Sequence, residues 1–183
     1  LLDDRVQRRA HVDALLKVAA SRPYDGIELN YEKMGGTPDK QLQTRVRAGF
    51  NALFSELCAR LHARGKTCVV TVMPRISGDG GVYNYRFLGK VADRVRIMGY
   101  NMHWANSKPG PLSSPAWYEA ILRYTTARVP KDKVEMAFPG YGWHWTKDGD
   151  SRAARVTWKE AEKLRQSKGL PYRLHASGNP YFA

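Results

Sequence analysis

Three polar side chains recur at every second position of one short stretch of the sequence. The nine residues from Tyr24 to Glu32 read YDGIELNYE, and the polar members of the second half are Glu28, Asn30 and Glu32. Alternate side chains of an extended strand point to the same face, so two carboxyl groups and one amide would share a face. A carboxyl group can pass a proton to a leaving oxygen, and an amide can orient a polar substrate beside it. The stretch therefore predicts an acid–base site.

The spacing of the two carboxyl groups limits this chemistry. Glu28 and Glu32 would have α-carbons about 13 Å apart in a strand that rises about 3.3 Å per residue. A double displacement on a sugar needs carboxyl groups about 5 Å apart, so this pair cannot perform it. Asn30 and Glu32 would be about 6.6 Å apart by the same rise, which suits one acid beside one orienting amide. The alternative is a polar strand face that only meets water at a sheet edge.

The elements around this stretch alternate between helix and strand. Apolar residues at three- and four-residue intervals predict helices over 4–20, 39–64, 85–92 and from 115 onward. Short apolar runs bounded by Gly or Pro predict strands over 24–32, 67–73, 94–101 and 134–138. Connections long enough for crossovers favour a parallel sheet covered by helices, which makes the fold class α/β. At the carboxyl ends of such strands, Glu32 would lie nearest the substrate and Glu28 deepest.

The character of the sequence changes near Thr146. A polar run follows, and Thr157 with Glu160 forms a capping-box pattern that predicts a last helix to about Lys168. We therefore predict one domain over 1–145 and the start of a small α+β insertion over 146–183. The first residue, Leu1, lies within a helical pattern, and the last residues resemble the start of an extended segment, so we expect a piece of a longer protein.

Three stretches point to one known family. Asp25, Gly26 and Glu32 match the pattern Asp-Gly-x-x-Asp-x-Asp-x-Glu, residues 98–101 read MGYN, and residues 138–143 read FPGYGW. In this order they resemble the fourth strand, the Met-x-Tyr-Asp segment and the end of the seventh strand of glycoside hydrolase family 18. This family includes chitinases and peptidoglycan N-acetylglucosaminidases. The resemblance implies a (β/α)8 TIM barrel, of which the chain would hold about strands four to seven.

A further likeness concerns the branch of the family. Residues 101–104 (NMHW) and 109–111 (PGP) are most similar to the spore-cortex and cell-envelope branch, which cleaves peptidoglycan. The resemblance therefore implies a protein of the extracellular space, the cell envelope or the spore. Its implied partner is a polysaccharide that contains N-acetylglucosamine, either chitin or peptidoglycan. Four strands cannot close a barrel that takes eight, which again indicates a piece of a longer protein.

The resemblance also implies a mechanism and a set of site residues. The acetamide oxygen of the substrate would attack the anomeric carbon, so no protein nucleophile is needed, and this family is an exception to the two-carboxylate scheme. Glu32 would be the general acid and then the base, Asn30 would orient the acetamide, and Tyr100 would donate a hydrogen bond to its carbonyl. The implied substrate-binding residues are Glu28, Met98, Asn101, Trp104 and Trp143.

Three positions depart from the family pattern. Glu28, Asn30 and Asn101 stand where the family has Asp. An amide at position 30 offers no full negative charge to the positive ring that forms during the reaction, a loss of a few kcal/mol at about tenfold per 1.4 kcal/mol. A related endoglycosidase family uses Asn in this role, so we expect slower or differently pH-tuned catalysis. The alternative is a lectin-like barrel that binds the sugar without cleaving it.

Charge and composition exclude other classes. The formal net charge of +13 would suit an acidic partner such as nucleic acid or an anionic glycopolymer. The basic residues are scattered over the predicted helices, which favours a solvated basic surface over a nucleic-acid site. No apolar run approaches the roughly 20 residues of a membrane span. His103 and His144 lack further ligands at metal spacing, so we expect no metal and no cofactor, and we expect Cys58 and Cys68 to be buried thiols.

Overall fold

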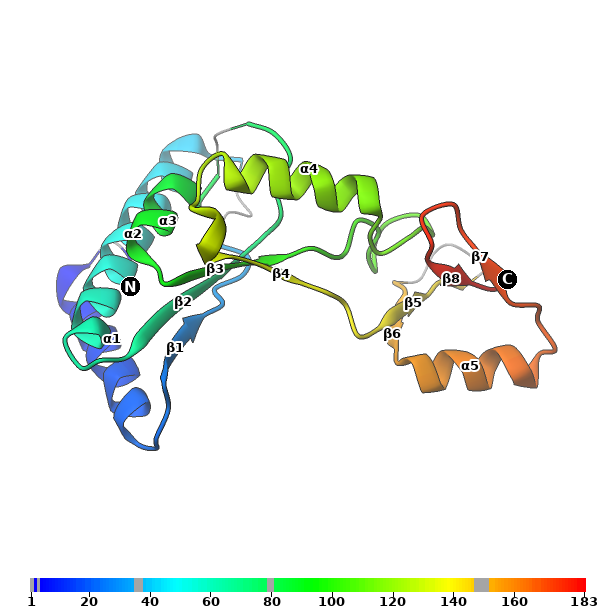
Figure 1. Cartoon of the computed structure of the whole chain (residues 1–183), viewed down its shortest axis with the longest axis horizontal. Coiled ribbons are helices and arrows are strands. Elements are labelled where there is room, and N and C mark those ends of the chain that lie inside the picture. The colour runs from blue at the N-terminus through cyan, green and yellow to red at the C-terminus, as the bar shows by residue number, and fades with distance from the viewer. Residues whose placement is uncertain (1, 3, 35–37, 79–80, 147–151) are drawn as a thin grey trace. The chain divides into compact units, whose positions relative to one another are not determined.

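The computed structural model of the protein describes residues 2, 4–34, 38–78, 81–146 and 152–183. The chain divides into two compact units (Figure 1). The first unit contains residues 1–98 and 123–136, and the second contains residues 99–122 and 137–183. Among the described helices, none combines the length and the hydropathy that a membrane-spanning segment requires.

The first unit is built on a parallel sheet. Its elements along the chain are α1 (Arg5–Ala20), β1 (Gly26–Leu29), α2 (Lys40–His62), β2 (Thr67–Val72), α3 (Tyr85–Val91), β3 (Arg94–Met98), the 3-10 turn Lys131–Lys133 and β4 (Val134–Ala137). The strand order is β1-β2-β3-β4, and β1, β2 and β3 pair in parallel. α1, α2 and α3 lie on one side of this sheet (Figure 1). The predicted α/β class with a parallel sheet is confirmed.

Apolar side chains fill the space between this sheet and its helices. Phe50, Phe54 and Leu57 of α2 are fully buried, as are Val70 of β2 and Ile97 of β3. Burial of each such side chain stabilises the fold by about 1.5–3 kcal/mol. Because strand side chains alternate, the polar residues of the same strands point to the opposite face of the sheet. The hydrophobic periodicity thus determines which face is left for polar groups.

Short polar side chains determine where the first two long helices begin. The carboxylate of Asp4 accepts hydrogen bonds from the amides of Val6 and Gln7 at the start of α1. Asp39 caps α2 in the same way. Each cap satisfies amides that have no partner within the helix, so each helix begins directly after its loop.

The two cysteines form a disulfide. Cys58 of α2 and Cys68 of β2 are bonded, with α-carbons 5.2 Å apart, and both are buried. The expectation of two buried thiols is therefore wrong. The pairing follows from how α2 packs on β2, since this brings a residue from the inner face of the helix against the first buried residue of the strand.

The second unit consists of small elements. Along the chain they are most of α4 (Pro115–Thr126), β5 (Gly142–His144), β6 (Ala154–Val156), α5 (Trp158–Ser167), β7 (Arg173–Leu174) and β8 (Pro180–Tyr181). β5 pairs with β6 and β7 with β8, both antiparallel. The predicted capping box at Thr157 and Glu160 is present at the start of α5. The amide of Ala153 donates to the carbonyl of Ala105 at 2.9 Å, which ties the loop after β3 to β6.

Several strands end earlier than the sequence pattern predicts. β1 ends at Leu29, β3 at Met98 and β4 at Ala137, so Asn30 and Glu32 follow a strand instead of lying within it. Residues 142–144 form β5 in a separate sheet, where a continuation of the seventh barrel strand was expected. The alternation of polar and apolar residues extends past the last paired residue of the strand. The alternation depends on which side of the chain faces the core, and it does not depend on where backbone pairing stops. The domain boundary after residue 145 stays a prediction.

Candidate active site

The predicted acid and amide lie together just beyond β1. Asn30 Nδ2 donates a hydrogen bond to Glu32 Oε1 at 3.1 Å, and both side chains are exposed. They stand at the carboxyl end of a strand in a parallel sheet, where ligands bind in such folds. Gly26 at the other end of β1 is explained by packing, since a Cβ there would lie 2.0 Å from the carbonyl oxygen of Thr67. The glycine of the motif therefore allows β1 to approach β2.

Tyr31 lies between these two residues and points toward the core. Its ring packs against Phe50 at 6.3 Å between centroids, and its hydroxyl is hydrogen-bonded to His11 Nε2. Burial raises the pKa of Tyr31. Its carbonyl accepts a hydrogen bond from the hydroxyl of Tyr83 at 2.5 Å. With Tyr31 turned inward, Asn30 and Glu32 are presented on the outer side.

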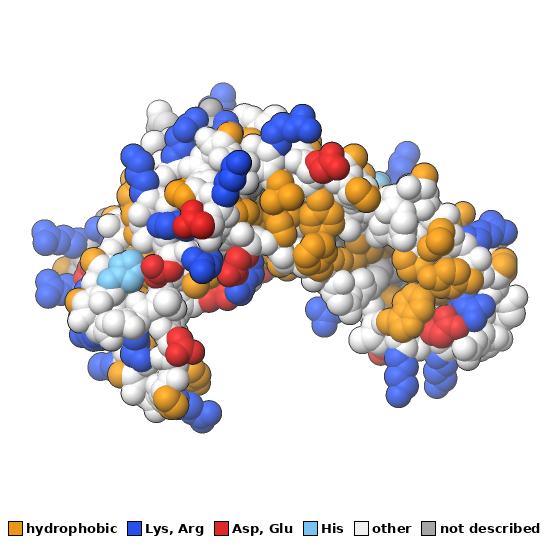
Figure 2. Space-filling view, viewed as in Figure 1, with side chains coloured by type: hydrophobic (Ala, Val, Ile, Leu, Met, Phe, Trp, Pro, Cys, Tyr) orange, Lys and Arg blue, Asp and Glu red, His pale blue; other side chains and the backbone are white. Residues whose placement is uncertain are grey.

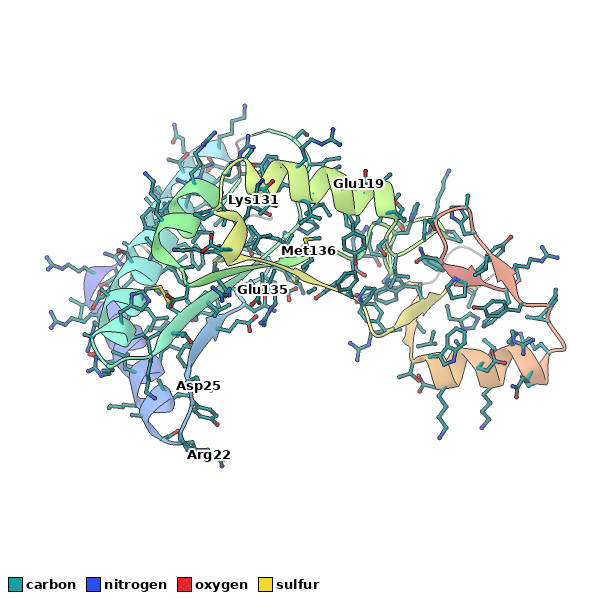
Figure 3. All side chains as sticks on the ribbon, viewed as in Figure 1. Arg22, Asp25, Glu119, Lys131, Glu135 and Met136 are labelled. Carbon is teal, nitrogen blue, oxygen red and sulfur yellow. A yellow bond between two sulfur atoms is a disulfide. The ribbon has the colours of Figure 1, made fainter. Side chains whose placement is uncertain are left out.

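A belt of hydrogen bonds and ion pairs crosses the polar face of the sheet. The sheet belt consists of Glu28, Thr71, Arg96 and Glu135, one residue from each strand. The Thr71 hydroxyl donates to one carboxylate oxygen of Glu28, and Arg96 pairs with the other. Arg96 also donates to Glu135 Oε2, from Nε at 3.0 Å and from Nη2 at 2.9 Å. Figure 3 labels Glu135 on β4.

In the sheet belt, the ion pairs of Arg96 offset the effect of its partial burial. Burial acts to lower the pKa of Arg96, but the bonds to Glu135 and Glu28 outweigh it and raise the pKa. Arg94 adds a longer contact to Glu135 Oε1 at 3.6 Å. Both carboxylate oxygens of Glu28 are thus held by protein groups. If Glu28 binds substrate as predicted, it does so from within this belt.

A second group of predicted residues gathers in the second unit, around Asn101. Its Oδ1 accepts hydrogen bonds from the Tyr141 hydroxyl at 2.7 Å and from Trp143 Nε1 at 3.2 Å. The ring of Tyr100 stands edge-on to Tyr141 at 6.0 Å. Asn101 has a φ of 66°, a left-handed conformation that Asn adopts more readily than most residues. We call Tyr100, Asn101, Tyr141 and Trp143 the aromatic cluster.

The remaining predicted residues are placed as follows. Met98 ends β3 and is buried, with 5% of its surface exposed, whereas Trp104 is 47% exposed in the loop of the second unit. Met98 lies in the first unit with Asn30 and Glu32, and Trp104 lies in the second with the aromatic cluster. An approach of Tyr100 to Asn30 stays a prediction.

The NMHW and PGP segments contact each other. His103 Nδ1 is hydrogen-bonded to the carbonyl of Pro111 at 2.9 Å. A Cβ at Gly110 would lie 2.5 Å from the His103 ring, so only glycine fits beneath it. His103 is therefore engaged in holding its loop. Within the described ranges, no three His, Cys, Asp or Glu side chains gather in a way that could hold a metal ion.

Sequence reasoning missed the other members of the sheet belt and Tyr83. A signal was present, because Thr71 and Arg96 interrupt apolar runs on the interior strands β2 and β3, and Glu135 interrupts the apolar run of β4. Charged residues rarely occupy such strands unless they are paired. Tyr83 had no comparable signal, since it lies in a loop and its partner is a backbone carbonyl.

Parallel strands covered by helices, with polar side chains at their carboxyl ends, are the arrangement of α/β enzymes such as the TIM barrels. The family model of the glycosyl hydrolases family 18 matches residues 1–182. The chain belongs to this family, and the resemblance stated from its motifs is confirmed.

Curated relatives and solved structures agree with this assignment. The uncharacterized glycosylase YvbX of Bacillus subtilis (strain 168) is 25% identical over 190 residues, which cover 100% of this chain and 53% of YvbX. The cortical fragment-lytic enzyme of Bacillus anthracis is 25% identical over 145 residues, covering 74% of this chain and 34% of that enzyme. The crystal structure of a class V chitinase from Pseudomonas fluorescens Pf-5 matches with a TM-score of 0.84 and 28% identity, covering 99% of this chain and 54% of that one. The chain spans about half the length of YvbX.

Proposed function

We propose that this chain forms part of a glycoside hydrolase that cleaves β-1,4 bonds next to N-acetylglucosamine in chitin or peptidoglycan. The observation that carries the proposal is the hydrogen bond between Asn30 and Glu32 at the carboxyl end of β1. It places one carboxyl group beside one amide, so a proton donor and a group that can orient an acetamide lie together. Membership of family 18 and the relatives named as a chitinase and a cortical fragment-lytic enzyme support the substrate class.

In the first half of the proposed reaction Glu32 is the general acid. The acetamide carbonyl oxygen of the bound sugar attacks the anomeric carbon as the glycosidic bond breaks, and Glu32 passes its proton to the leaving oxygen. In the second half, the Glu32 carboxylate takes a proton from a water molecule. The oxygen of this water attacks the anomeric carbon, which opens the ring formed by the acetamide and restores the original anomeric configuration. Each proton that Glu32 gives is thus recovered, and no protein nucleophile takes part.

Asn30 is proposed to orient the acetamide. Its Nδ2 is engaged by Glu32, which leaves Oδ1 as the acceptor for the acetamide N–H. The proposed role of Tyr100 is to donate a hydrogen bond to the acetamide carbonyl, and Met98, Trp104 and Trp143 are proposed to line the sugar site. Trp104 offers an exposed aromatic face on which a sugar ring can stack.

The test is the release of reducing ends by the protein in its full natural length. N-acetylglucosamine oligomers and peptidoglycan fragments are the two substrates to compare. Glu32→Gln is expected to lower turnover by about 10²–10⁴-fold, because general acid–base catalysis contributes that much. Glu119→Gln is the matched control, since Glu119 is an exposed carboxyl group on α4 (Figure 3). Equal turnover in the two variants would refute the proposed role of Glu32.

The alternative function is a lectin-like barrel. The observation that favours it is the amide at Asn30 and at Asn101, where the family has carboxyl groups. Sugar binding without release of reducing ends, in the wild-type protein, would establish this alternative. A nucleic-acid partner would instead show binding that falls steeply with salt. Figure 2 shows Lys and Arg side chains dispersed over the visible face, which does not favour such a partner.

A further inference from the structure

The segment that carries Asn30 and Glu32 extends beyond the sheet. In the described residues the ladder between β1 and β2 ends at the pair Leu29 and Val70. Backbone pairing therefore does not fix the position of residue 32. A catalytic group must be held within a fraction of an ångström of its productive position, so other contacts have to supply this precision.

Tyr83 supplies one such contact at the peptide bond next to Glu32. Its hydroxyl donates to the carbonyl of Tyr31, and that carbonyl belongs to the peptide group joining Tyr31 to Glu32. The bond fixes the orientation of this peptide group and so the direction in which the Glu32 side chain leaves the backbone. At the other end of Tyr31 the bond to His11 holds the side chain in the core.

Tyr83 is itself anchored. Its ring stands edge-on to Phe50 at 6.0 Å, and Phe50 is fully buried and stacks on Phe54. The next residue, Asn84, caps α3 by accepting from the amide of Phe87. The hydroxyl of Tyr83 is thus held at a fixed point by the core and by the start of a helix. A bond from such a point can restrain an otherwise unpaired segment.

Tyr83 also lies close enough to Glu32 for the charge of the carboxylate to act on its hydroxyl. Burial, and then the negative charge of Glu32, raise the pKa of Tyr83 to about 12. The hydroxyl therefore stays protonated at any pH at which a glycosidase works, and it always donates. The contact is a permanent restraint and not a proton shuttle.

We infer that Tyr83 is a positioning residue, which orients Glu32 against Asn30 by holding the carbonyl of Tyr31. The inference rests on the proposed function and adds to it a residue that does not touch substrate. Removal of the hydroxyl alone should leave the ring packed on Phe50, so the fold survives while the Glu32 side chain gains freedom.

The experiment compares Tyr83→Phe with Tyr85→Phe. Tyr85 is the matched control, because its buried hydroxyl also donates to a backbone carbonyl after a strand, that of Met73, at 2.5 Å. Tyr83→Phe is expected to lower kcat by roughly tenfold to a hundredfold with little change in KM, because misplacement of a catalytic group has effects of that size. Tyr85→Phe should leave kcat close to that of the wild type, although both variants lose a part-buried hydrogen bond and some thermal stability. Equal kcat in the two variants would overturn the inference.

A readout without turnover separates this inference from the proposed function. The side-chain amide signals of asparagine are followed by nitrogen-15 NMR at one fixed pH, and the Asn30 signal is assigned by its loss in Asn30→Ala. In Tyr83→Phe this signal should move toward the position it takes in Glu32→Ala, because a looser Glu32 no longer accepts the hydrogen bond from Asn30 Nδ2. A protein without turnover in which the Asn30 signal still moves would refute the function and keep the inference. An unchanged Asn30 signal in Tyr83→Phe would refute the inference.

Discussion

Asn30 Nδ2 and Glu32 Oε1 are 3.1 Å apart, so a neutral amide is the hydrogen-bond partner of the proposed acid. A carboxylate at position 30 could support the positive ring of the proposed reaction with a full negative charge, which an amide cannot do. On the proposed mechanism, the exchange of the family's Asp for Asn30 therefore removes electrostatic support from the reaction.

Asn30→Asp tests this exchange. The new carboxylate should stabilise the positive ring formed from the acetamide, so kcat should rise by about tenfold for each 1.4 kcal/mol gained. The measurement is kcat on N-acetylglucosamine oligomers at one fixed pH. A kcat equal to that of the wild type would contradict the proposed place of Asn30 beside the reacting acetamide.

Arg96→Met tests the sheet belt. The change leaves Glu28 and Glu135 without their shared cation, so the free energy of unfolding should fall by about 1 kcal/mol, a modest value because these side chains are partly exposed. Denaturation by urea measures it. The control is the triple variant in which Glu28 and Glu135 also become Gln. It should recover part of the loss, and a triple variant less stable than Arg96→Met would show that the belt is not coupled.

Asn101 can be tested by two substitutions that separate its contacts from its backbone conformation. Asn101→Gly removes the acceptor for Tyr141 and Trp143 but accepts the positive φ without strain. Asn101→Ala removes the same acceptor and adds strain, so it should be less stable than the glycine variant by about 1 kcal/mol. Thermal unfolding of both variants provides the comparison. Equal stability would mean that the conformation at residue 101 does not constrain the loop.

Asp93 should make stability depend on pH. Burial acts to raise the pKa of Asp93, but hydrogen bonds from the Cys68 amide at 2.7 Å and from His62 at 2.8 Å outweigh it and hold the pKa below its usual value. The folded state therefore favours the carboxylate. Its contribution is fully present above the unfolded pKa of about 3.9 and is lost as pH falls through the lowered folded value.

The variant Asp93→Asn should lose this part of the acid dependence. Urea denaturation at several values between pH 2 and pH 7 would measure the difference in unfolding free energy between wild type and variant. That difference should shrink as pH falls below about 4, since the wild-type carboxylate is then protonated as well. A constant difference over the range would show that Asp93 is not bound more tightly as the anion in the folded state.

Much of the fold could be predicted from the sequence, because local residue patterns determine where its main helices and strands form. The apolar period of α2 and the capping box of Thr157 and Glu160 depend only on residues a few positions apart, and both are found where the pattern placed them. The family motif around Glu32 was likewise readable, since it lies on one continuous stretch. The ends of the strands were less well predicted, because pairing depends on the neighbouring strand and alternation does not.

The sequence by itself determined the helices, the presence of the four strands of the first unit, the polar face of β1 and the family. Only the tertiary structure decided that Cys58 is bonded to Cys68, that Arg96 joins Glu28 across the sheet, and that Tyr83 holds the peptide group before Glu32. Each of these contacts joins residues that are remote in sequence or lie on different elements. Whether these residues come into contact depends on the register of the strands and on the packing of the helices. Both are properties of the folded chain, and neither produces a periodic pattern in the sequence.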